Sequence, residues 1–244
     1  MERTKNTNKN SLRVASFWFC RKVVAEQKAV GWALRRRLSS SLIMYYVLLY
    51  YPRFDSKVEE NIEAFRKKYD PFVGSLKPHI PFMFPVPCDE VVETKLTEHI
   101  ETVLRNWKPF QIQLRGFTKS WDNWLLLTLK KGNKNAMALH NELYTGILSP
   151  YLRKDIEYIP HIGMGLFVKK DAEYNVLDPK KVDFDANLYS QALKEAKSLK
   201  INSFDTVDRL FLDKIKVRVD KSLQANAQSR HNLVKTVSSK EIKL

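Results

Sequence analysis

Two histidine residues lie in a repeated tripeptide, Pro78-His79-Ile80 and Pro160-His161-Ile162, and are 82 positions apart. An unperturbed imidazole has a pKa of about 6.5, so one ring can accept a proton near neutral pH while a second donates one. Two imidazoles that face one cleft can therefore act as general base and general acid without a metal ion. The repeat also predicts two related halves of the chain, each of which contributes one histidine.

Each histidine is expected at the centre of a β-strand, over residues 77–86 and 158–167. Side chains alternate between the two faces of a strand, so a histidine shares its face with the residue two positions later. The opposite face of each strand carries apolar residues that would pack in a core. The residues that share the histidine faces are Pro81 and Met83 in the first strand, and Gly163 and Gly165 in the second.

The rest of the sequence alternates between helical and strand patterns. We predict helices between Asp55 and Pro71, between Asp89 and Pro109, and over residues 134–149 and 187–199. Further strands are predicted over 42–52, 110–114 and 124–129, and near 205–219. Helix, histidine strand, helix and strand follow one another in both halves. This order predicts an α+β fold of two duplicated β-α-β modules with a pseudo-twofold central cleft.

The composition is strongly basic, with 42 Lys and Arg residues against 27 Asp and Glu residues and a net charge of +15. Such a charge favours a polyanionic partner such as nucleic acid, although it also suits a merely soluble basic protein. The two cysteines, Cys20 and Cys88, form no metal-binding motif, and we expect no metal or cofactor. The longest apolar run, Met44–Tyr51, is too short to span a membrane. Two cysteines without a disulfide framework favour a reducing compartment, so we expect a cytoplasmic protein. We also expect a monomer.

Residues 1–42 form a basic N-terminal extension, because ten Lys and Arg residues stand there against only two acids. Three interpretations stay open for this extension. It could be a transit peptide, which would make the location mitochondrial, or a disordered basic arm. It could also be upstream sequence joined to a domain whose natural start is Met44, which we favour slightly. We expect the folded domain over residues 43–218 and a polar C-terminal tail over 219–244.

Two strands of the form His-hydrophobic-Thr/Ser-hydrophobic, in a bilobal α/β domain, resemble the 2H phosphoesterase superfamily. That superfamily includes the 2′-5′ RNA ligase-like proteins and the cyclic phosphodiesterases. The resemblance covers about residues 43–218 and rests on His79-Ile80-Pro81-Phe82 and His161-Ile162-Gly163-Met164, with the order of elements. It implies a metal-independent RNA or nucleotide phosphoesterase that acts on 2′,3′-cyclic or 2′-5′ phosphodiesters. His79 and His161 would then be the catalytic acid–base pair.

The sequence departs from that motif at its third position, where the family has a Thr or Ser whose hydroxyl donates to the phosphate. Pro81 and Gly163 stand there, and neither side chain can donate a hydrogen bond. This departure keeps open an alternative, a catalytically weak or inactive relative that binds RNA or a nucleotide. Arg115, Lys130 and Lys131 are candidates to hold phosphates, Trp121 and Trp124 are candidates to stack on bases, and His140 is expected to be a core residue.

Overall fold

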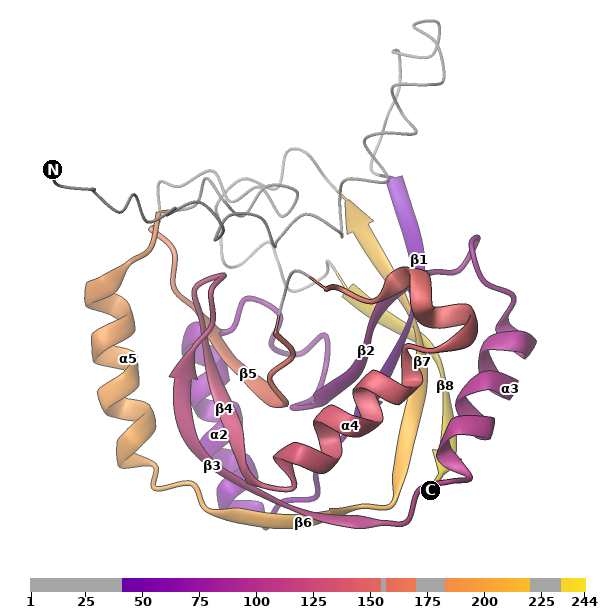
Figure 1. Cartoon of the computed structure of the whole chain (residues 1–244). Coiled ribbons are helices and arrows are strands. Elements are labelled where there is room, and N and C mark those ends of the chain that lie inside the picture. The colour runs from indigo at the N-terminus through magenta and orange to yellow at the C-terminus, as the bar shows by residue number, and fades with distance from the viewer. Residues whose placement is uncertain (1–40, 155–156, 170–182, 220–233) are drawn as a thin grey trace, which may run out of the picture.

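Two antiparallel four-stranded sheets form the centre of the protein (Figure 1). The structure is a computed structural model that describes residues 41–154, 157–169, 183–219 and 234–244. The first sheet has the order β2-β1-β7-β8, and the second has the order β5-β4-β3-β6. The strands are β1 (Ser41–Tyr50), β2 (Ile80–Pro87), β3 (Phe110–Lys119), β4 (Trp124–Lys131), β5 (His161–Leu166), β6 (Ser203–Val207), β7 (Arg209–Val219) and β8 (Val234–Lys243).

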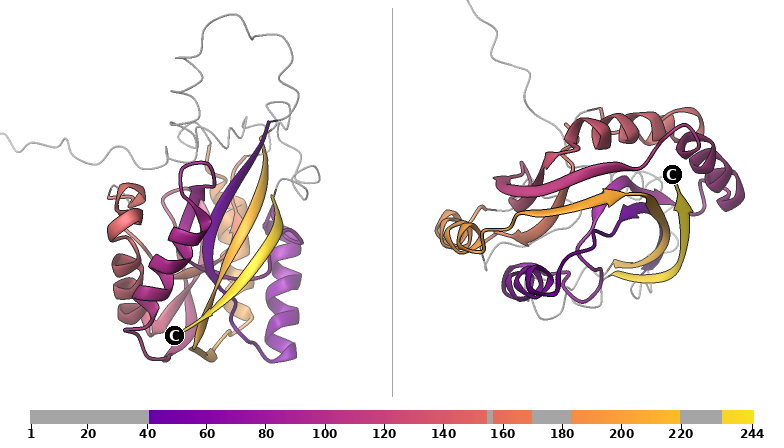
Figure 2. Two further views of the ribbon diagram at one scale, coloured as in Figure 1. Left: turned by 90° about the vertical axis from the view of Figure 1, so that its right-hand side faces the viewer. Right: turned by 90° about the horizontal axis from the view of Figure 1, so that it is seen from below.

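The helices lie around the outside of the two sheets (Figure 2). They are α2 (Ser56–Tyr69), α3 (Glu93–Leu104), α4 (Asn133–Leu143) and α5 (Ala186–Ser198), with a short 3₁₀ segment, η2 (Gly146–Tyr151). Among the described residues, no helix is long and apolar enough to cross a membrane. Antiparallel sheets with helices on their outer sides confirm the predicted α+β class.

The duplication predicted from the repeat is visible in the connections. The first module runs β1-α2-β2-α3 and the second runs β4-α4-β5-α5, and in each the two strands pair antiparallel. The two modules also exchange helices, because α2 contacts β5 of the second module while α4 contacts β2 of the first. Each histidine strand is therefore supported by a helix from the other half of the chain.

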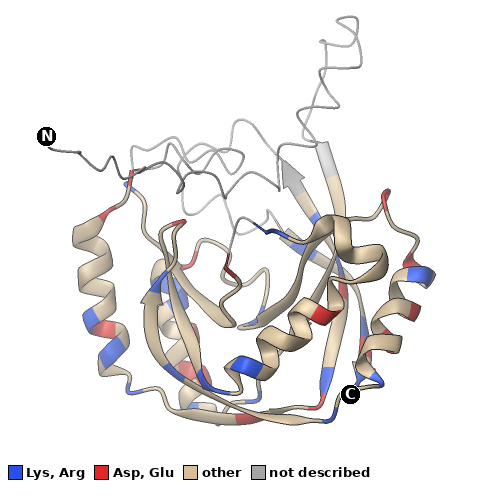
Figure 3. Cartoon of the chain, viewed as in Figure 1, with Lys and Arg blue, Asp and Glu red and all other residues tan. Residues whose placement is uncertain are grey.

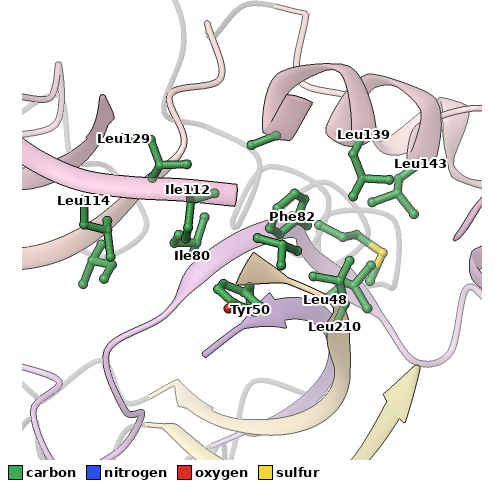
Figure 4. Close-up of a cluster of buried hydrophobic side chains, with 14 of the residues drawn as sticks. Leu48, Tyr50, Ile80, Phe82, Ile112, Leu114, Leu129, Leu139, Leu143 and Leu210 are labelled. Carbon is green, nitrogen blue, oxygen red and sulfur yellow. The ribbon is translucent and has the colours of Figure 1, made fainter. Parts of the chain in front are cut away.

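One apolar core joins the two halves (Figure 4). It takes alternate residues of the strands, such as Leu48 and Tyr50 of β1, and the inward faces of the helices, such as Leu139 and Leu143 of α4. Full burial of one large aliphatic side chain stabilises a fold by about 1.5–3 kcal/mol. The helix starts are also defined locally, since Asp55 accepts a hydrogen bond from the Val58 amide at 2.9 Å.

Three expectations need correction. His79 precedes the first residue of β2 and His161 is the first residue of β5, so neither lies at the centre of its strand. The helix expected over 134–149 ends at Leu143, because Gly146 adopts a φ of 52° and the chain continues as η2. The polar tail expected over 219–244 contains β8, which pairs with β7 over most of its length.

The strand β8 gave no signal in the sequence because most of its side chains face solvent. It lies at the edge of its sheet, and of its ten residues only Ile242 is buried. The backbone ladder with β7, which sequence periodicity does not report, holds it in place. The extension over residues 1–40 lies outside the described residues, and the domain boundaries remain predictions.

The strand β2 is an edge strand, and side chains from the second module satisfy its outer backbone groups. Buried His140 of α4 donates from Nδ1 to the Phe82 carbonyl at 2.9 Å, which confirms it as a core histidine. The Tyr144 hydroxyl accepts from the Phe84 amide at 2.9 Å, and the Tyr158 hydroxyl donates to the Pro81 carbonyl at 2.7 Å. The rings of Tyr158 and His140 are stacked, with centroids 3.7 Å apart.

We predict that Tyr158→Phe lowers the free energy of unfolding by about 1–3 kcal/mol, because it leaves the half-buried Pro81 carbonyl without its buried donor. Urea unfolding followed by circular dichroism measures this. Tyr189→Phe is the matched control, since no hydrogen bond joins its hydroxyl to a described residue, and we expect a change within about 0.5 kcal/mol. Equal effects of the two substitutions would contradict the role given to Tyr158.

Candidate active site

The two histidines lie where the two sheets meet. Strands β2 and β5 are edge strands of different sheets, and they contact each other at the middle of the molecule (Figure 1). His79 directly precedes β2 and His161 begins β5, so both rings are carried by the strand ends at this junction. An electrostatic interaction between the two imidazoles, which lowers the pKa of His79, is consistent with rings that lie near each other.

Both rings are held by the same local hydrogen bond. Nδ1 of His79 donates to the Lys77 carbonyl at 2.7 Å, and Nδ1 of His161 donates to the Ile159 carbonyl at 2.5 Å. A carbonyl oxygen can only accept, so each Nδ1 carries the hydrogen. In the neutral ring, Nε2 is then left with its lone pair available to accept a proton. The equivalent bond in each module gives two rings of the same tautomer.

The surroundings lower the pKa of both rings. The pKa of His79 is lowered to about 4, mainly by burial. The hydrogen bond to the Lys77 carbonyl opposes this shift, and the positive charges of Arg66 and His161 add to it. Burial also lowers the pKa of His161, while the Ile159 carbonyl and the Asp122 carboxylate oppose that shift. Both residues nevertheless keep part of their surface exposed. They are recessed side chains that solvent or a ligand can still reach.

The charge coupling between the two rings disfavours a state in which both are protonated. Their neighbours also differ in sign, because a cation acts on His79 and an anion acts on His161. The two rings therefore have unequal electrostatic surroundings.

Tyr51 stands against the His79 ring. The two rings meet edge to face, with centroids 6.1 Å apart. The Tyr51 hydroxyl donates to the Asp213 carboxylate at 2.5 Å, and the Ser239 hydroxyl donates to the same carboxylate. Asp213 is only 1% exposed, so this contact fixes Tyr51 to the interior of the first sheet. Tyr51 thus limits the positions that the His79 ring can adopt.

Arg66 holds the segment that leads into His79. Its side chain is buried and donates to Asp70 at 2.9 Å and to Glu63 at 2.9 Å. It also donates to the Leu76 carbonyl at 3.0 Å, three residues before the histidine. The same guanidinium thus anchors the backbone and places a positive charge near the imidazole.

The face around His161 is partly aromatic. A Cβ atom at Gly163 would lie 3.5 Å from the Trp124 ring, so Trp124 covers the position beside the histidine. Phe72 stacks on Trp124, with centroids 6.0 Å apart and an angle of 13° between the planes. Gly165 packs more tightly, because a Cβ there would lie 2.5 Å from the Cβ of Tyr69 on α2. Gly165 is therefore required for the packing of α2 on β5.

The residues at the third motif position have structural explanations. Pro81 lacks an N–H, which is tolerated because β2 is an edge strand, and its carbonyl accepts from Tyr158. Gly163 lies on β5 opposite Leu126 of β4, beside the Trp124 ring. Neither residue supplies a hydroxyl to the histidine pair.

The basic candidates lie on the second sheet. Arg115 is exposed at a register shift of β3, and no described residue forms an ion pair or hydrogen bond with it. Lys130 is exposed near the end of β4, beyond the Thr128–His161 pair, while Lys131 donates to Gln111 at 2.7 Å. Positive and negative side chains are interspersed over the described elements (Figure 3). Trp121 is 49% exposed in the turn before β4.

Sequence reasoning missed the residues that surround the two rings. Tyr51 directly follows β1, Arg66 lies on α2 and Asp122 lies in the turn before β4, and only the tertiary fold brings them near the histidines. The one local signal was the Trp121-Asp122-Asn123 turn, which placed a carboxylate next to a predicted strand. Among the described residues there is no group of three or more His, Cys, Asp and Glu side chains that could hold a metal ion.

We predict that stability falls as the pH is lowered from 7 to 5. His79 and His140 have folded pKa values of about 4, against an ordinary value of 6.5, so the unfolded chain binds more protons in this window. Each of these two histidines should lower the free energy of unfolding by about 2 kcal/mol at pH 5 relative to pH 7. Denaturant unfolding at both pH values measures this. His79→Asn keeps an N–H donor but has no group that titrates in this window. The variant should therefore lose about 2 kcal/mol less of its unfolding free energy between pH 7 and pH 5 than the parent protein does. An unchanged loss would contradict the lowered pKa.

Comparison with known proteins identifies a family whose model covers both histidine motifs. The family model of the 2′-5′ RNA ligase superfamily matches residues 54–205, which include both histidines. A protein of Geobacillus kaustophilus with the provisional name phosphoesterase is 24% identical over 169 residues, covering 69% of this chain and 86% of its own length. A similarly named protein of Bacillus licheniformis is 21% identical over 140 residues, covering 57% and 80%.

Solved structures show more distant similarity. Escherichia coli LigT complexed with 3′-AMP covers 84% of this chain and 100% of its own, with 10% identity and a TM-score of 0.45. The same protein complexed with NADP⁺ has a TM-score of 0.41 at 11% identity, with the same coverage. The family match spans more than half of the chain and includes the repeated histidine motif. The chain belongs to the 2′-5′ RNA ligase superfamily, a phosphoesterase family of the 2H type.

Proposed function

We propose that the protein is a metal-independent phosphoesterase that acts on 2′,3′-cyclic or 2′-5′ phosphodiesters of RNA or nucleotides. The main support for this proposal is that His79 and His161 lie on two contacting edge strands and are held by the same kind of hydrogen bond to a backbone carbonyl. In each ring the Nδ1–H group donates to a backbone carbonyl, so Nε2 is the atom that can take part in the reaction. Family membership supports a phosphoesterase activity, and the paired rings supply a chemical basis for it.

For a cyclic phosphate, Nε2 of His79 takes a proton from water while the water oxygen bonds to phosphorus. The bond between phosphorus and one ribose oxygen breaks, and that oxygen takes a proton from Nε2 of His161. His79 ends protonated and His161 ends neutral, and exchange with solvent restores the starting state. A ribose hydroxyl in place of water gives transesterification, so ligation is the same site working in reverse. Each proton transfer contributes about 10²–10⁴ in rate.

The roles follow from the charges beside each ring. Arg66 and His161 disfavour a proton on His79, which suits a base. Asp122 favours a proton on His161, which suits an acid. A bound phosphodiester adds a negative charge between the rings, which raises the pKa of His161 from its lowered value. The acid would therefore become charged mainly when substrate is present.

Substrate binding is assigned to the second sheet. Arg115 and Lys130 are exposed there and could neutralise neighbouring phosphates, and Trp124 beside Gly163 offers a face for a base. The net charge of +15 supports a polyanionic substrate. Residues 1–40 carry +8 of this charge, so only about half of the excess lies in the remaining chain.

A second candidate function is binding of RNA or a nucleotide with little or no turnover. The absence of a hydroxyl at Pro81 and Gly163 favours it. A hydrogen bond to a charged group contributes about 1.5–3 kcal/mol, so two lost donors would slow the reaction by about 10²–10⁴ unless another group replaces them.

We predict that the purified protein hydrolyses a 2′,3′-cyclic mononucleotide or a 2′-5′ dinucleotide in EDTA, and that His79→Ala and His161→Ala each lower kcat by at least about 10². Product formation followed by chromatography measures this. His99→Gln is the matched control, because its ring contacts the Leu143 carbonyl away from the pair. Binding of RNA without turnover of either substrate would instead support the binding module.

The same assay separates the two roles. A substrate with a nitrophenolate leaving group needs no general acid. On this substrate His161→Ala should lower kcat less than about tenfold, while His79→Ala should lower kcat as much as on the other substrates. Equal defects of both variants on that substrate would contradict the assignment of His161 as the acid.

A further inference from the structure

A threonine on β4 lies directly across from the second histidine. Thr128 is the register partner of His161 in the antiparallel β4–β5 ladder. Directly opposed residues of such a ladder project from the same face, with Cβ atoms about 4.5–5.5 Å apart. The face that carries His161 therefore carries a hydroxyl, supplied from the neighbouring strand and not from the histidine strand itself.

The Thr128 hydroxyl is weakly engaged. The residue is half-buried, and its hydroxyl donates to the Gly116 carbonyl at 3.3 Å, near the limit for a hydrogen bond. A hydroxyl rotates about its C–O bond and takes the stronger acceptor. An anionic phosphate oxygen is a better acceptor than a neutral carbonyl at this distance.

A bulge in β3 keeps the space around this hydroxyl open. The β3–β4 register shifts between Leu114 and Phe117, which lie opposite Leu129 and Leu127 on either side of Thr128. Gly116 lies within that bulge with a φ of 95°, and a Cβ there would lie 3.7 Å from the Thr128 hydroxyl. Glycine is suited to this backbone conformation and adds no side chain against the hydroxyl.

The other histidine has a hydroxyl neighbour of a different kind. Tyr51 stands against His79, but its single O–H already donates to buried Asp213 at 2.5 Å. Pro81 has neither a hydroxyl nor an N–H, and its carbonyl is occupied by Tyr158. The two modules are therefore alike in their histidines and unlike in the donors that accompany them.

We propose that Thr128 is a catalytic residue whose hydroxyl donates to a non-bridging oxygen of the phosphate held between His79 and His161. It replaces the hydroxyl that residue 163 does not provide and stabilises the negative charge that grows on that oxygen. This proposal rests on the proposed phosphoesterase function. It accounts for an intact histidine pair in a chain whose third motif positions carry no donor.

The test compares kcat/KM for a 2′,3′-cyclic mononucleotide among strand variants. Thr128→Val keeps the shape and removes the hydroxyl, and we expect a loss of about ten- to a hundredfold. Thr128→Ser keeps the hydroxyl and should stay within about threefold of the parent protein. Thr236→Val is the matched control, because Thr236 is half-buried on β8, in the other sheet, and should leave the rate unchanged.

A rescue variant separates chemistry from structure. Among the described residues, a Cβ at Gly163 would meet only the Trp124 ring, at an ordinary 3.5 Å, so Gly163→Ser fits β5 and restores a hydroxyl two residues after His161. Added to Thr128→Val, it should recover at least about tenfold in kcat/KM. A purely structural defect at residue 128 would not respond to a hydroxyl at residue 163.

The outcomes distinguish this proposal from the one on which it rests. No turnover by the parent protein would overturn the proposed function and the role of Thr128 with it. Turnover by the parent, with Thr128→Val as active as Thr236→Val, would overturn only the role of Thr128. Equal losses in the Val and Ser variants, without rescue by Gly163→Ser, would also overturn it, because the hydroxyl would then not be responsible.

Discussion

The hydrogen bond from each histidine Nδ1 to the carbonyl two residues before it is the interaction on which the rest of the site depends. It fixes the tautomer, so that Nε2 of both His79 and His161 carries the lone pair in the neutral ring and is the atom that we propose as base or acid. The bond needs the backbone just before each strand to keep one conformation. Arg66 supplies this in the first module by holding the Leu76 carbonyl.

The fold serves that requirement by exchanging helices between its halves. α2 packs on β5 and α4 packs on β2, so neither histidine strand can move without disturbing the other module. The outer edge of β2 is closed by His140, Tyr144 and Tyr158. This closure makes proline acceptable at residue 81, since the strand has no further partner that needs its N–H. The feature that weakens the family motif is thus compatible with the architecture.

The repeated tripeptide and the alternation of helix and strand were enough to predict the class of the fold, its duplication and the two strands next to the histidines. Apolar periodicity reports burial, and most of these elements bury at least one face. It does not report strands that bury few side chains and are held mainly by backbone hydrogen bonds, and β8 was missed for that reason. Nor does it report register between strands, so Thr128 opposite His161 could not be found before the sheet was known.

The two modules differ more in the groups that surround each histidine than in the histidines themselves. Each module keeps a histidine with the same anchor, while the surrounding charges differ in sign and the nearby hydroxyls differ in their partners. A duplicated fold can in this way place two identical rings in unequal environments. Unequal environments let one ring serve as base and the other as acid at a single pH.

The central claim is that both rings bind one phosphate. It is tested most directly by NMR titration of the histidine rings with and without a saturating nucleoside 2′-monophosphate. The account predicts that the pKa of His79 and the pKa of His161 both rise when the nucleotide is bound, because one anion lies against both rings. The pKa of His140, which is buried on α4, should stay unchanged. A bound nucleotide that raises the pKa of only one of the two rings, or of neither, would contradict the account.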